Sequence, residues 1–281
     1  MTNPYQLTEQ NTLISFSGGR TSAFMLYKIL EASDFKLPKT VQVVFANTGR
    51  EMPETYDFVQ RCGDEWGVHI TWLEYRVIKD EKKNKNRHTF DIVNHNSASR
   101  NGEPFEALIK SRKTLPNNHQ RFCTSEMKVM TIKRYLKSIG WKEKWINTVG
   151  IRGDERHRIS ISREKEWDNW YPIADDNKGK RDIMAFWKQQ PFDLKVTGGL
   201  GNCDGCFLKS EKNLATLWRL HPERAQWWQN IEEIQHGKRK RTFHKTRTYR
   251  ELGDFVSRQG DWIFDTQGAL CQADDGECTG H

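Results

Sequence analysis

The sequence contains no apolar run that approaches the ~18 residues of a membrane-spanning helix, so no membrane is expected as a partner. Residues 1–10 have neither the basic start nor the apolar run of a secretory signal. The 281 residues also contain no internal repeat and no long low-complexity linker. These absences favour a globular, cytoplasmic protein.

Cysteine is scarce, and the sequence holds six thiols: Cys62, Cys123, Cys203, Cys206, Cys271 and Cys278. In a cytosolic chain of this size they are not expected to form a disulfide framework. Metal binding or redox catalysis is the better interpretation, because Cys203 and Cys206 form a Cys-x-x-Cys pair. Cys62 lies inside a predicted helix and is expected to be a plain core or surface thiol.

Acidic residues are outnumbered, with 37 Asp and Glu against 45 Lys and Arg. The net charge of +8 favours anionic partners such as nucleotides, nucleic acid or sulfate esters, although it also fits a solvated basic surface. Residues 237–250 are strongly basic, with Phe243 and Tyr249 interleaved. Cations contact phosphates and aromatic rings stack on unpaired bases, so this stretch indicates nucleic acid as a candidate partner, with a solvated loop or a set of cations that binds a sulfonucleotide as the alternatives. Trp218, Trp227 and Trp228 lie on predicted helices and are expected in the core.

Strand and helix patterns alternate along the first part of the chain. Short apolar runs predict strands at residues 12–16, 41–46, 68–75 and 145–149, and helical spacing predicts helices at residues 21–32, 53–66 and 123–139. This alternation predicts an α/β fold with a Rossmann-like parallel sheet of about five strands and helices on both faces.

The remaining segments have weaker patterns. Residues 79–120 are interpreted as an excursion, partly helical near 104–111, that could close over a ligand. Helices are predicted near residues 182–188, 211–220 and 222–235. We expect a nucleotide-binding domain over residues 1–175 and a helical, cysteine-bearing region with a flexible tail over residues 176–281.

The predicted first strand runs into a loop that suits a phosphate group: Ser17, Gly18, Gly19, Arg20, Thr21 and Ser22. Glycines let backbone N–H groups approach phosphate oxygens, and the following helix N-terminus adds free donors. The Walker spacing is absent. The second strand ends in Asn47, Thr48 and Gly49, and ligands of doubly wound sheets bind at strand ends. A plain strand-to-helix turn is the alternative interpretation.

These motifs resemble those of the N-type ATP pyrophosphatases (PP-loop enzymes), in particular the phosphoadenosine phosphosulfate reductase family. Residues 17–22 look like that family's Ser-Gly-Gly-x-x-Ser loop, and residues 45–49 resemble its Asp-Thr-Gly strand end, with Asn47 replacing the acid. The segment from Gly150 through Arg152 resembles its Gly-Ile-Arg-Arg motif, and residues 171–175 are similar to its Pro-Leu-x-Asp-Trp motif without the Trp. The resemblance implies an adenine nucleotide alpha hydrolase-like fold and binding of ATP or a related adenine nucleotide with Mg²⁺.

The cysteines resemble the cluster ligands of some sulfonucleotide reductases. Cys123 matches the first Cys of that group's Cys-Cys pair, Thr124 replaces the second, and Cys203 and Cys206 match its distant Cys-x-x-Cys. The resemblance implies a 4Fe–4S cluster with Cys271 as a fourth ligand, or with an open iron site. A structural zinc ion or free thiols are the alternatives.

The end of the chain, with Cys278, is similar to the Glu-Cys-Gly-x-His tail of reductases, although Thr279 and Gly280 are transposed. The resemblance implies that Cys278 could act as a mobile nucleophile, and chance similarity is the alternative.

The leading prediction is an enzyme that binds ATP and adenylates an acceptor, with nucleic acid as one candidate, for sulfur transfer from a donor protein. An intact Ser-Gly-Gly loop favours ATP over a sulfonucleotide. Arg20, Lys128 and Arg152 are expected to neutralise phosphate charge. One alternative is a sulfonucleotide reductase in which Cys278 takes the sulfonyl group and thioredoxin releases sulfite. The other is a non-catalytic nucleotide- or nucleic-acid-binding accessory protein.

Overall fold

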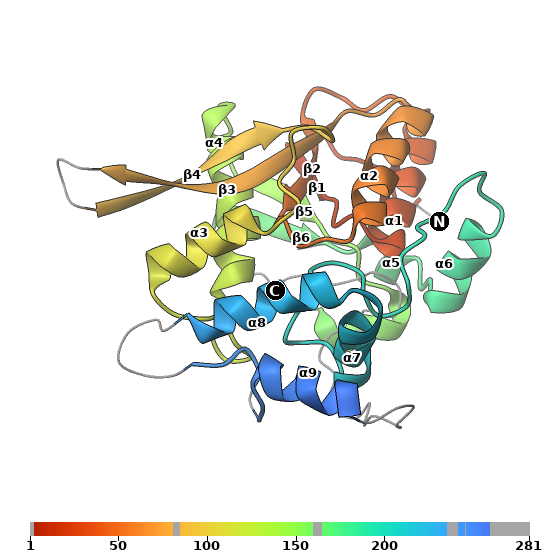
Figure 1. Cartoon of the computed structure of the whole chain (residues 1–281). Helices are drawn as coiled ribbons and strands as arrows, with labels where there is room; N and C mark the ends of the chain where they lie inside the picture. The colour runs from red at the N-terminus through yellow and green to blue at the C-terminus, as the bar shows by residue number, and fades with distance from the viewer. Residues whose placement is uncertain (1–2, 81–84, 160–164, 235–240, 245, 259–281) are drawn as a thin grey trace.

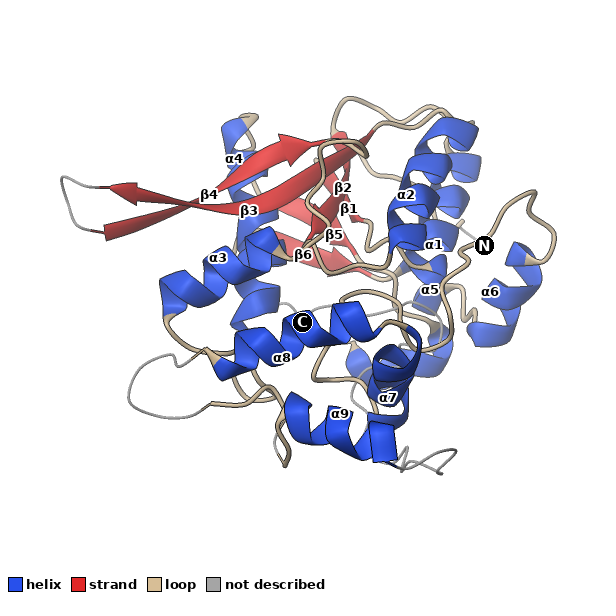
Figure 2. Cartoon of the chain, in the orientation of Figure 1, coloured by secondary structure: helices blue, strands red, loops and turns tan. Residues whose placement is uncertain are grey.

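The computed structural model describes residues 3–80, 85–159, 165–234, 241–244 and 246–258. Its six-stranded sheet has the order β4-β3-β2-β1-β5-β6 (Figure 2). The strands are β1 (Thr12–Ser15), β2 (Val41–Asn47), β3 (Ile70–Asp80), β4 (Lys85–Val93), β5 (Trp145–Thr148) and β6 (Trp167–Trp170). All neighbouring pairs are parallel except β3 and β4, which form a long antiparallel hairpin. The predicted α/β fold with a mostly parallel sheet is confirmed.

Helices cover both faces of the sheet (Figure 1). On one face, alternate strand residues such as Ile14 and Phe45 pack against α1 (Arg20–Ala32), α2 (Pro53–Trp66) and α6 (Lys180–Trp187). On the other face, Leu13 and Val44 pack against α4 (Thr131–Ser138). The two-residue period of the strands therefore produces two apolar cores separated by the sheet.

A third core joins elements that are far apart in the sequence. Here α3 (Glu103–Arg112) and the π-helix η1 (Thr124–Met130) pack with α7 (Glu211–Leu220), α8 (Pro222–Glu233) and α9 (Tyr249–Arg258). This core spans the predicted domain boundary at residue 175, and the division of the chain into two domains stays a prediction. None of the described helices is long and apolar enough to cross a membrane.

Short elements complete the described part of the chain: the 3-10 helix η2 (Gly153–Arg158) and helix α5 (Pro172–Asp175). Two of the six strands were not located from the sequence. β6 was not predicted, and β4 pairs antiparallel with β3 inside the supposed excursion. The helix predicted at residues 123–139 is divided into η1 and α4. α9, which begins at Tyr249 near the end of the basic stretch and continues beyond it, was not predicted either.

Candidate functional site

The loop after β1 is shaped by its glycines. Gly18 has φ = +82°, and a Cβ at this position would lie 2.9 Å from Thr55 Cγ2, so only glycine fits without strain. The hydroxyl groups of Ser17 and Ser22 are 2.9 Å apart, and Ser22 Oγ donates to Gly19 O at 3.0 Å. Gly19, which has no side chain, stands at the N-cap of α1. First-turn N–H groups of a helix that begins in this way suit an anion.

The loop after β5 lies against the start of α1. β1 lies between β2 and β5. The strands that follow β1 are added first on its β2 side and later on its β5 side, so the topological switch point of the sheet lies between β1 and β5. A Cβ at Gly150 would lie 3.3 Å from Ser22 Cα and 3.4 Å from Ser22 N. The absence of a side chain therefore allows the two loops to approach at the position where doubly wound folds bind ligands.

Arg20 is paired with a carboxylate of the protein. Its Nε donates to Asp193 Oδ1 at 2.7 Å, its Nη2 donates to Asp193 Oδ2 at 2.9 Å, and Nη2 also donates to Leu194 O. A phosphate at the α1 N-terminus would have to compete with this bidentate pair for the guanidinium group.

At the loop after β2, the side-chain amide of Asn47 both donates and accepts hydrogen bonds. Nδ2 donates to Glu74 Oε1 at 2.6 Å and to Ser99 O at 2.9 Å, while Oδ1 accepts from Gly49 N at 2.9 Å and from the Tyr56 hydroxyl at 3.1 Å. A carboxylate in place of Asn47 would set a second negative charge beside Glu74 and could not donate to it. An amide at position 47 therefore suits the side chain of Glu74 on the neighbouring strand.

Thr48 connects this loop to a cysteine. Its backbone N donates to Glu51 Oε2 at 3.1 Å, its hydroxyl donates to Glu51 Oε1 at 2.7 Å, and its Oγ1 lies 3.2 Å from Cys203 Sγ. Because the single hydroxyl proton points to the carboxylate, the thiol of Cys203 is the donor to Thr48. Glu51 is buried, and the hydroxyl of Tyr56 also faces its carboxylate. The pKa of Tyr56 is raised, mainly by the burial of its own ring and next by the negative charge of Glu51.

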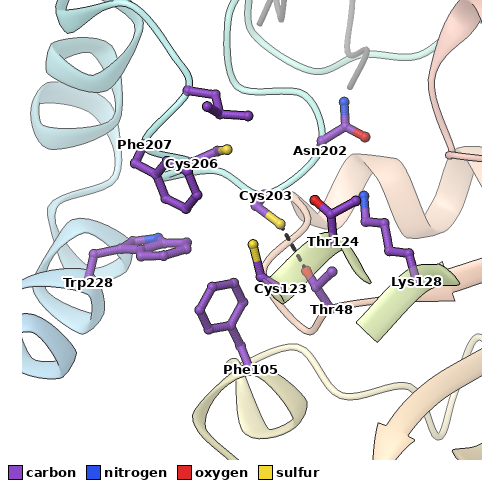
Figure 3. A pocket seen from close by; sticks show the side chains of 11 residues that line it. Thr48, Phe105, Cys123, Thr124, Lys128, Asn202, Cys203, Cys206, Phe207 and Trp228 are labelled. Atoms are coloured by element: carbon purple, nitrogen blue, oxygen red, sulfur yellow. Dashed lines mark hydrogen bonds between the residues drawn. The ribbon is translucent and has the colours of Figure 1, made fainter. Parts of the chain in front are cut away.

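Three of the predicted cysteines line one pocket (Figure 3). Cys123 comes from the start of η1, while Cys203 and Cys206 come from the loop before α7. In Figure 3 the side chains of Cys123 and Cys203 both lie in this pocket, and the Cys203 sulfur points toward Thr48. The other lining residues are Thr48, Phe105, Thr124, Lys128, Asn202, Phe207, Leu208 and Trp228. The pocket thus brings together the thiols, the predicted cation Lys128 and one predicted nucleotide contact, Thr48.

Thiol donors suit a cluster or a zinc ion. Within the residues that the structure describes, however, no three or more His, Cys, Asp or Glu side chains form a group that could hold a metal ion. These residues alone therefore do not fit a cluster, and the fourth predicted ligand, Cys271, lies outside them. Burial and then the Glu51 carboxylate raise the pKa of Cys203, while Lys128 acts in the opposite direction. The 4Fe–4S cluster and the zinc ion stay predictions.

Lys128 is presented by a widened helical turn. η1 is a π-helix, and the Thr131 hydroxyl donates to Glu126 O, five residues earlier, at 2.8 Å. Turns of this kind are frequent at functional sites. The helical period expected for residues 123–139 is interrupted at the residues that line the cysteine pocket.

Arg152 is buried and faces two carboxylates. Its Nε lies 2.8 Å from Asp154 Oδ1 and 3.6 Å from Glu155 Oε2, at the start of η2. Its predicted role in neutralising phosphate stays a prediction.

The C-terminal nucleophile predicted at Cys278 lies outside the described residues, as does part of the basic stretch at residues 237–250. The expectation that Phe243 and Tyr249 could stack on bases was wrong, because both rings are fully buried in the third core. Trp218 and Trp228 are buried there as predicted, and Cys62 is a core thiol whose pKa is raised by burial.

Two buried acids at the site were not predicted. Glu51 shapes the loop after β2, and Asp204, between the two cysteines of the Cys-x-x-Cys pair, contacts Arg50 of that loop. The position of Asp204 between the two cysteines of the Cys-x-x-Cys pair was a usable signal. The contacts of Glu51 with Thr48 span only three residues, so the Thr-x-x-Glu spacing was a usable local signal as well.

The family model for the phosphoadenosine phosphosulfate reductase domain matches residues 11–186. The match covers more than half of the chain, which therefore belongs to this family, within the adenine nucleotide alpha hydrolase-like superfamily.

Two relatives are proteins of unknown activity. The chain is 31% identical over 202 residues to the uncharacterized nin region protein ORF290 of Escherichia phage lambda, covering 72% of this chain and 67% of that protein. It is 21% identical over 239 residues to the uncharacterized protein MJ0066 of Methanocaldococcus jannaschii, covering 83% of this chain but only 43% of that protein.

A solved structure with a similar arrangement is the phosphate complex of phosphoadenylyl-sulfate (PAPS) reductase from Candida auris. The TM-score is 0.41 at 17% identity, over 66% of this chain and 76% of that one.

Proposed function

We propose that the chain is an enzyme that binds ATP with Mg²⁺ and adenylates an acceptor for sulfur transfer. The observation that carries the proposal is the pocket in which Cys123, Cys203 and Cys206 meet Thr48, the residue that follows the Asn47 end of strand β2. The family of the chain supports sulfur chemistry on an adenine nucleotide.

The loops after β1 and β5 support the nucleotide half of the proposal. Gly18, Gly19 and Gly150 leave the backbone at the start of α1 without side chains that would exclude a phosphate group. The Ser17 hydroxyl lies at the same point, 2.9 Å from that of Ser22, and could turn to donate to a phosphate oxygen.

The chemistry has two steps. A nucleophilic oxygen of the acceptor attacks the α-phosphorus of ATP, and pyrophosphate leaves with the electrons of the broken P–O bond. Hydrosulfide released by a donor protein then attacks the activated carbon of the acceptor, forms the C–S bond and displaces AMP, which leaves with the electrons of the broken C–O bond. Lys128 carries a positive charge into the pocket and would stabilise anionic sulfur or phosphate there.

A second function, reduction of adenylyl sulfate or its 3′-phosphate, is favoured by the family that matches residues 11–186. In that reaction Cys278 would attack the sulfonyl sulfur and release the nucleotide, and thioredoxin would then release sulfite from the S-sulfocysteine.

The two functions are distinguished by their products. Purified protein is incubated without oxygen, either with ATP and Mg²⁺ or with adenylyl sulfate and a dithiol, and pyrophosphate and sulfite are measured. A nucleic-acid extract serves as the acceptor mixture in the first case. The proposal expects pyrophosphate that depends on that mixture and falls at least about tenfold in Lys128→Gln.

A matched control is Lys110→Gln, which changes an exposed lysine paired with Glu106 on α3. Sulfite that disappears in Cys278→Ser, without pyrophosphate, would replace the proposal by the reductase. Nucleotide binding without either product would favour an accessory protein.

A further inference from the structure

We propose that Asp204 is a positioning residue that holds Cys203 and Cys206 in the pocket by tying their loop to Arg50, Arg224 and Trp228. The inference concerns the pocket of the proposed function and rests on that function for its catalytic significance. It assigns a task to the acid between the two cysteines, which does not itself line the pocket.

Asp204 is fully buried, and both of its carboxylate oxygens accept hydrogen bonds. Oδ1 accepts from Trp228 Nε1 and from its neighbour Gly205 N, each at 2.7 Å. Oδ2 accepts from Arg50 Nη2 at 2.9 Å and from Arg224 Nε. The carboxylate therefore joins three separate parts of the chain: the loop after β2, the Cys-x-x-Cys loop and helix α8.

The contacts of Asp204 bring two positive charges together around one buried negative charge. Two guanidinium groups share one buried carboxylate, and Arg50 also lies 4.5 Å from the centre of the Trp227 ring. Burial is the main reason that the pKa of Arg50 is lowered. The negative charge of Asp204 opposes this shift, and the positive charge of Arg224 adds to it. Removal of the carboxylate charge would leave the buried Arg50 and the partly buried Arg224 facing each other without the carboxylate that they share.

The backbone of the Cys-x-x-Cys loop is fixed by the same contacts. Asp204 N donates to Arg50 O at 2.9 Å, and Cys206 N donates to Cys203 O at 3.2 Å, which closes a turn around the acid. A Cβ at Gly205 would lie 2.4 Å from Trp228 Nε1, so the turn is pressed directly onto the indole ring. Neither cysteine can shift without a change in the contacts of Asp204.

The position of Cys203 against Thr48 is a consequence of this arrangement. Arg50 follows Thr48 by two residues, and its side chain and backbone both bind Asp204, which follows Cys203 directly. Arg224 adds a second link, because its Nη2 donates to Glu51 O at 2.7 Å. The 3.2 Å contact between Thr48 Oγ1 and Cys203 Sγ is thus held from both loops.

The test measures the alkylation rate of each cysteine by iodoacetamide in the full chain as purified, with peptide mass spectrometry as the readout. The variants are Asp204→Asn, which keeps the shape but removes the charge, and Trp228→Phe, which removes the indole N–H donor together with part of a buried ring that lines the pocket. Asp91→Asn is the matched control, because it breaks an exposed 2.8 Å ion pair with Arg76 on the β3–β4 hairpin. Cys62 is the internal control, since its thiol is buried in another core and reacts only when the whole molecule unfolds.

We expect the rate at Cys203 to rise on the order of tenfold in Asp204→Asn and to rise measurably in Trp228→Phe, because the loop opens locally. The ratio of the Cys203 rate to the Cys206 rate changes, while Cys62 stays unreactive and Asp91→Asn behaves as wild type. Equal increases at Cys203 and Cys62 would reduce Asp204 to a contributor to global stability. Unchanged Cys203 rates in Trp228→Phe and in a folded Asp204→Asn would overturn the proposal.

Alkylation requires no turnover. A positive result without pyrophosphate release would therefore leave Asp204 as a positioning residue and remove only the proposed function. Unchanged alkylation rates together with pyrophosphate release would keep the proposed function and remove the positioning role of Asp204.

Discussion

At the scale of single residues, the carboxyl end of β2 is a set of buried polar side chains that satisfy one another. The amide of Asn47 donates to Glu74, and the hydroxyl of Thr48 donates to Glu51. Each of these polar side chains therefore depends on a buried acid for its hydrogen bond. Such groups are costly to change, because the partner left behind is buried without a hydrogen bond.

Glu51→Gln tests this directly. The amide can replace only one of the two acceptor oxygens that receive the Thr48 backbone N–H and hydroxyl group. We expect the free energy of unfolding, measured by urea denaturation, to fall by about 1–3 kcal/mol.

The control for this substitution is Glu65→Gln, which changes an exposed acid paired with Arg61 at 3.2 Å. Its effect should stay within about 0.5 kcal/mol. Equal effects of the two substitutions would show that Glu51 contributes no more than a surface charge.

At the scale of elements, the turn from β1 into α1 combines a positive φ with close packing. Gly18→Ala would strain the backbone and press a methyl group against Thr55, whereas a Cβ at Gly140, where φ = +93°, would have nothing within 4 Å. We expect Gly140→Ala to cost about 1 kcal/mol from strain alone. Gly18→Ala should cost at least about 1 kcal/mol more because it also overpacks the turn.

Thermal and urea unfolding of the two alanine variants measure this difference. Equal losses of stability would mean that the turn around Gly18 is loose enough to accept a methyl group. That result would contradict a rigid phosphate loop.

The elements with strong local signals were predicted well. α2 begins at Pro53 and ends before Gly67, which adopts φ = +60°, so both of its ends follow from residue types with a fixed preference. The order of strand and helix through β3, and the Ser-Gly-Gly turn, follow from apolar spacing in the same way. The cysteine pocket was expected only through resemblance to a family.

Elements that depend on tertiary contacts were not predicted. β4 is mostly polar, with exposed residues at Lys85, Asn86 and Arg87, and is recognisable as a strand only through its register with β3. The π-helical turn of η1 and the burial of Phe243 likewise depend on packing against other parts of the chain. No local pattern carries that information.

At the scale of the whole molecule, buried acidic groups predict how stability depends on pH. Burial raises the pKa of Cys62, and burial together with Asp176 raises the pKa of Tyr5. In the unfolded chain these groups release their protons near their ordinary pKa values of about 8.5 and 10. The unfolded state then binds fewer protons than the folded state, so stability falls as the pH rises.

We therefore expect the free energy of unfolding to decline progressively from about pH 8.5 upward, as urea titrations at a series of pH values would measure. Cys62→Ala should reduce the part of the decline that begins near the thiol pKa, to which Cys203 also contributes, while leaving the later part in place. A curve that is flat or rises across this range would contradict the burial of both groups.

The central claim, that an adenine nucleotide binds where the loops after β1 and β5 meet, is tested by calorimetric titration of ATP with Mg²⁺ into the wild-type protein and Gly150→Ala. The new Cβ would lie 3.3 Å from Ser22 Cα, so the variant should weaken binding about tenfold, or 1.4 kcal/mol. Gly198→Ala, where a Cβ meets nothing within 4 Å, should bind as wild type. Absence of ATP binding to the wild-type protein, or equal affinity in Gly150→Ala, would contradict the account.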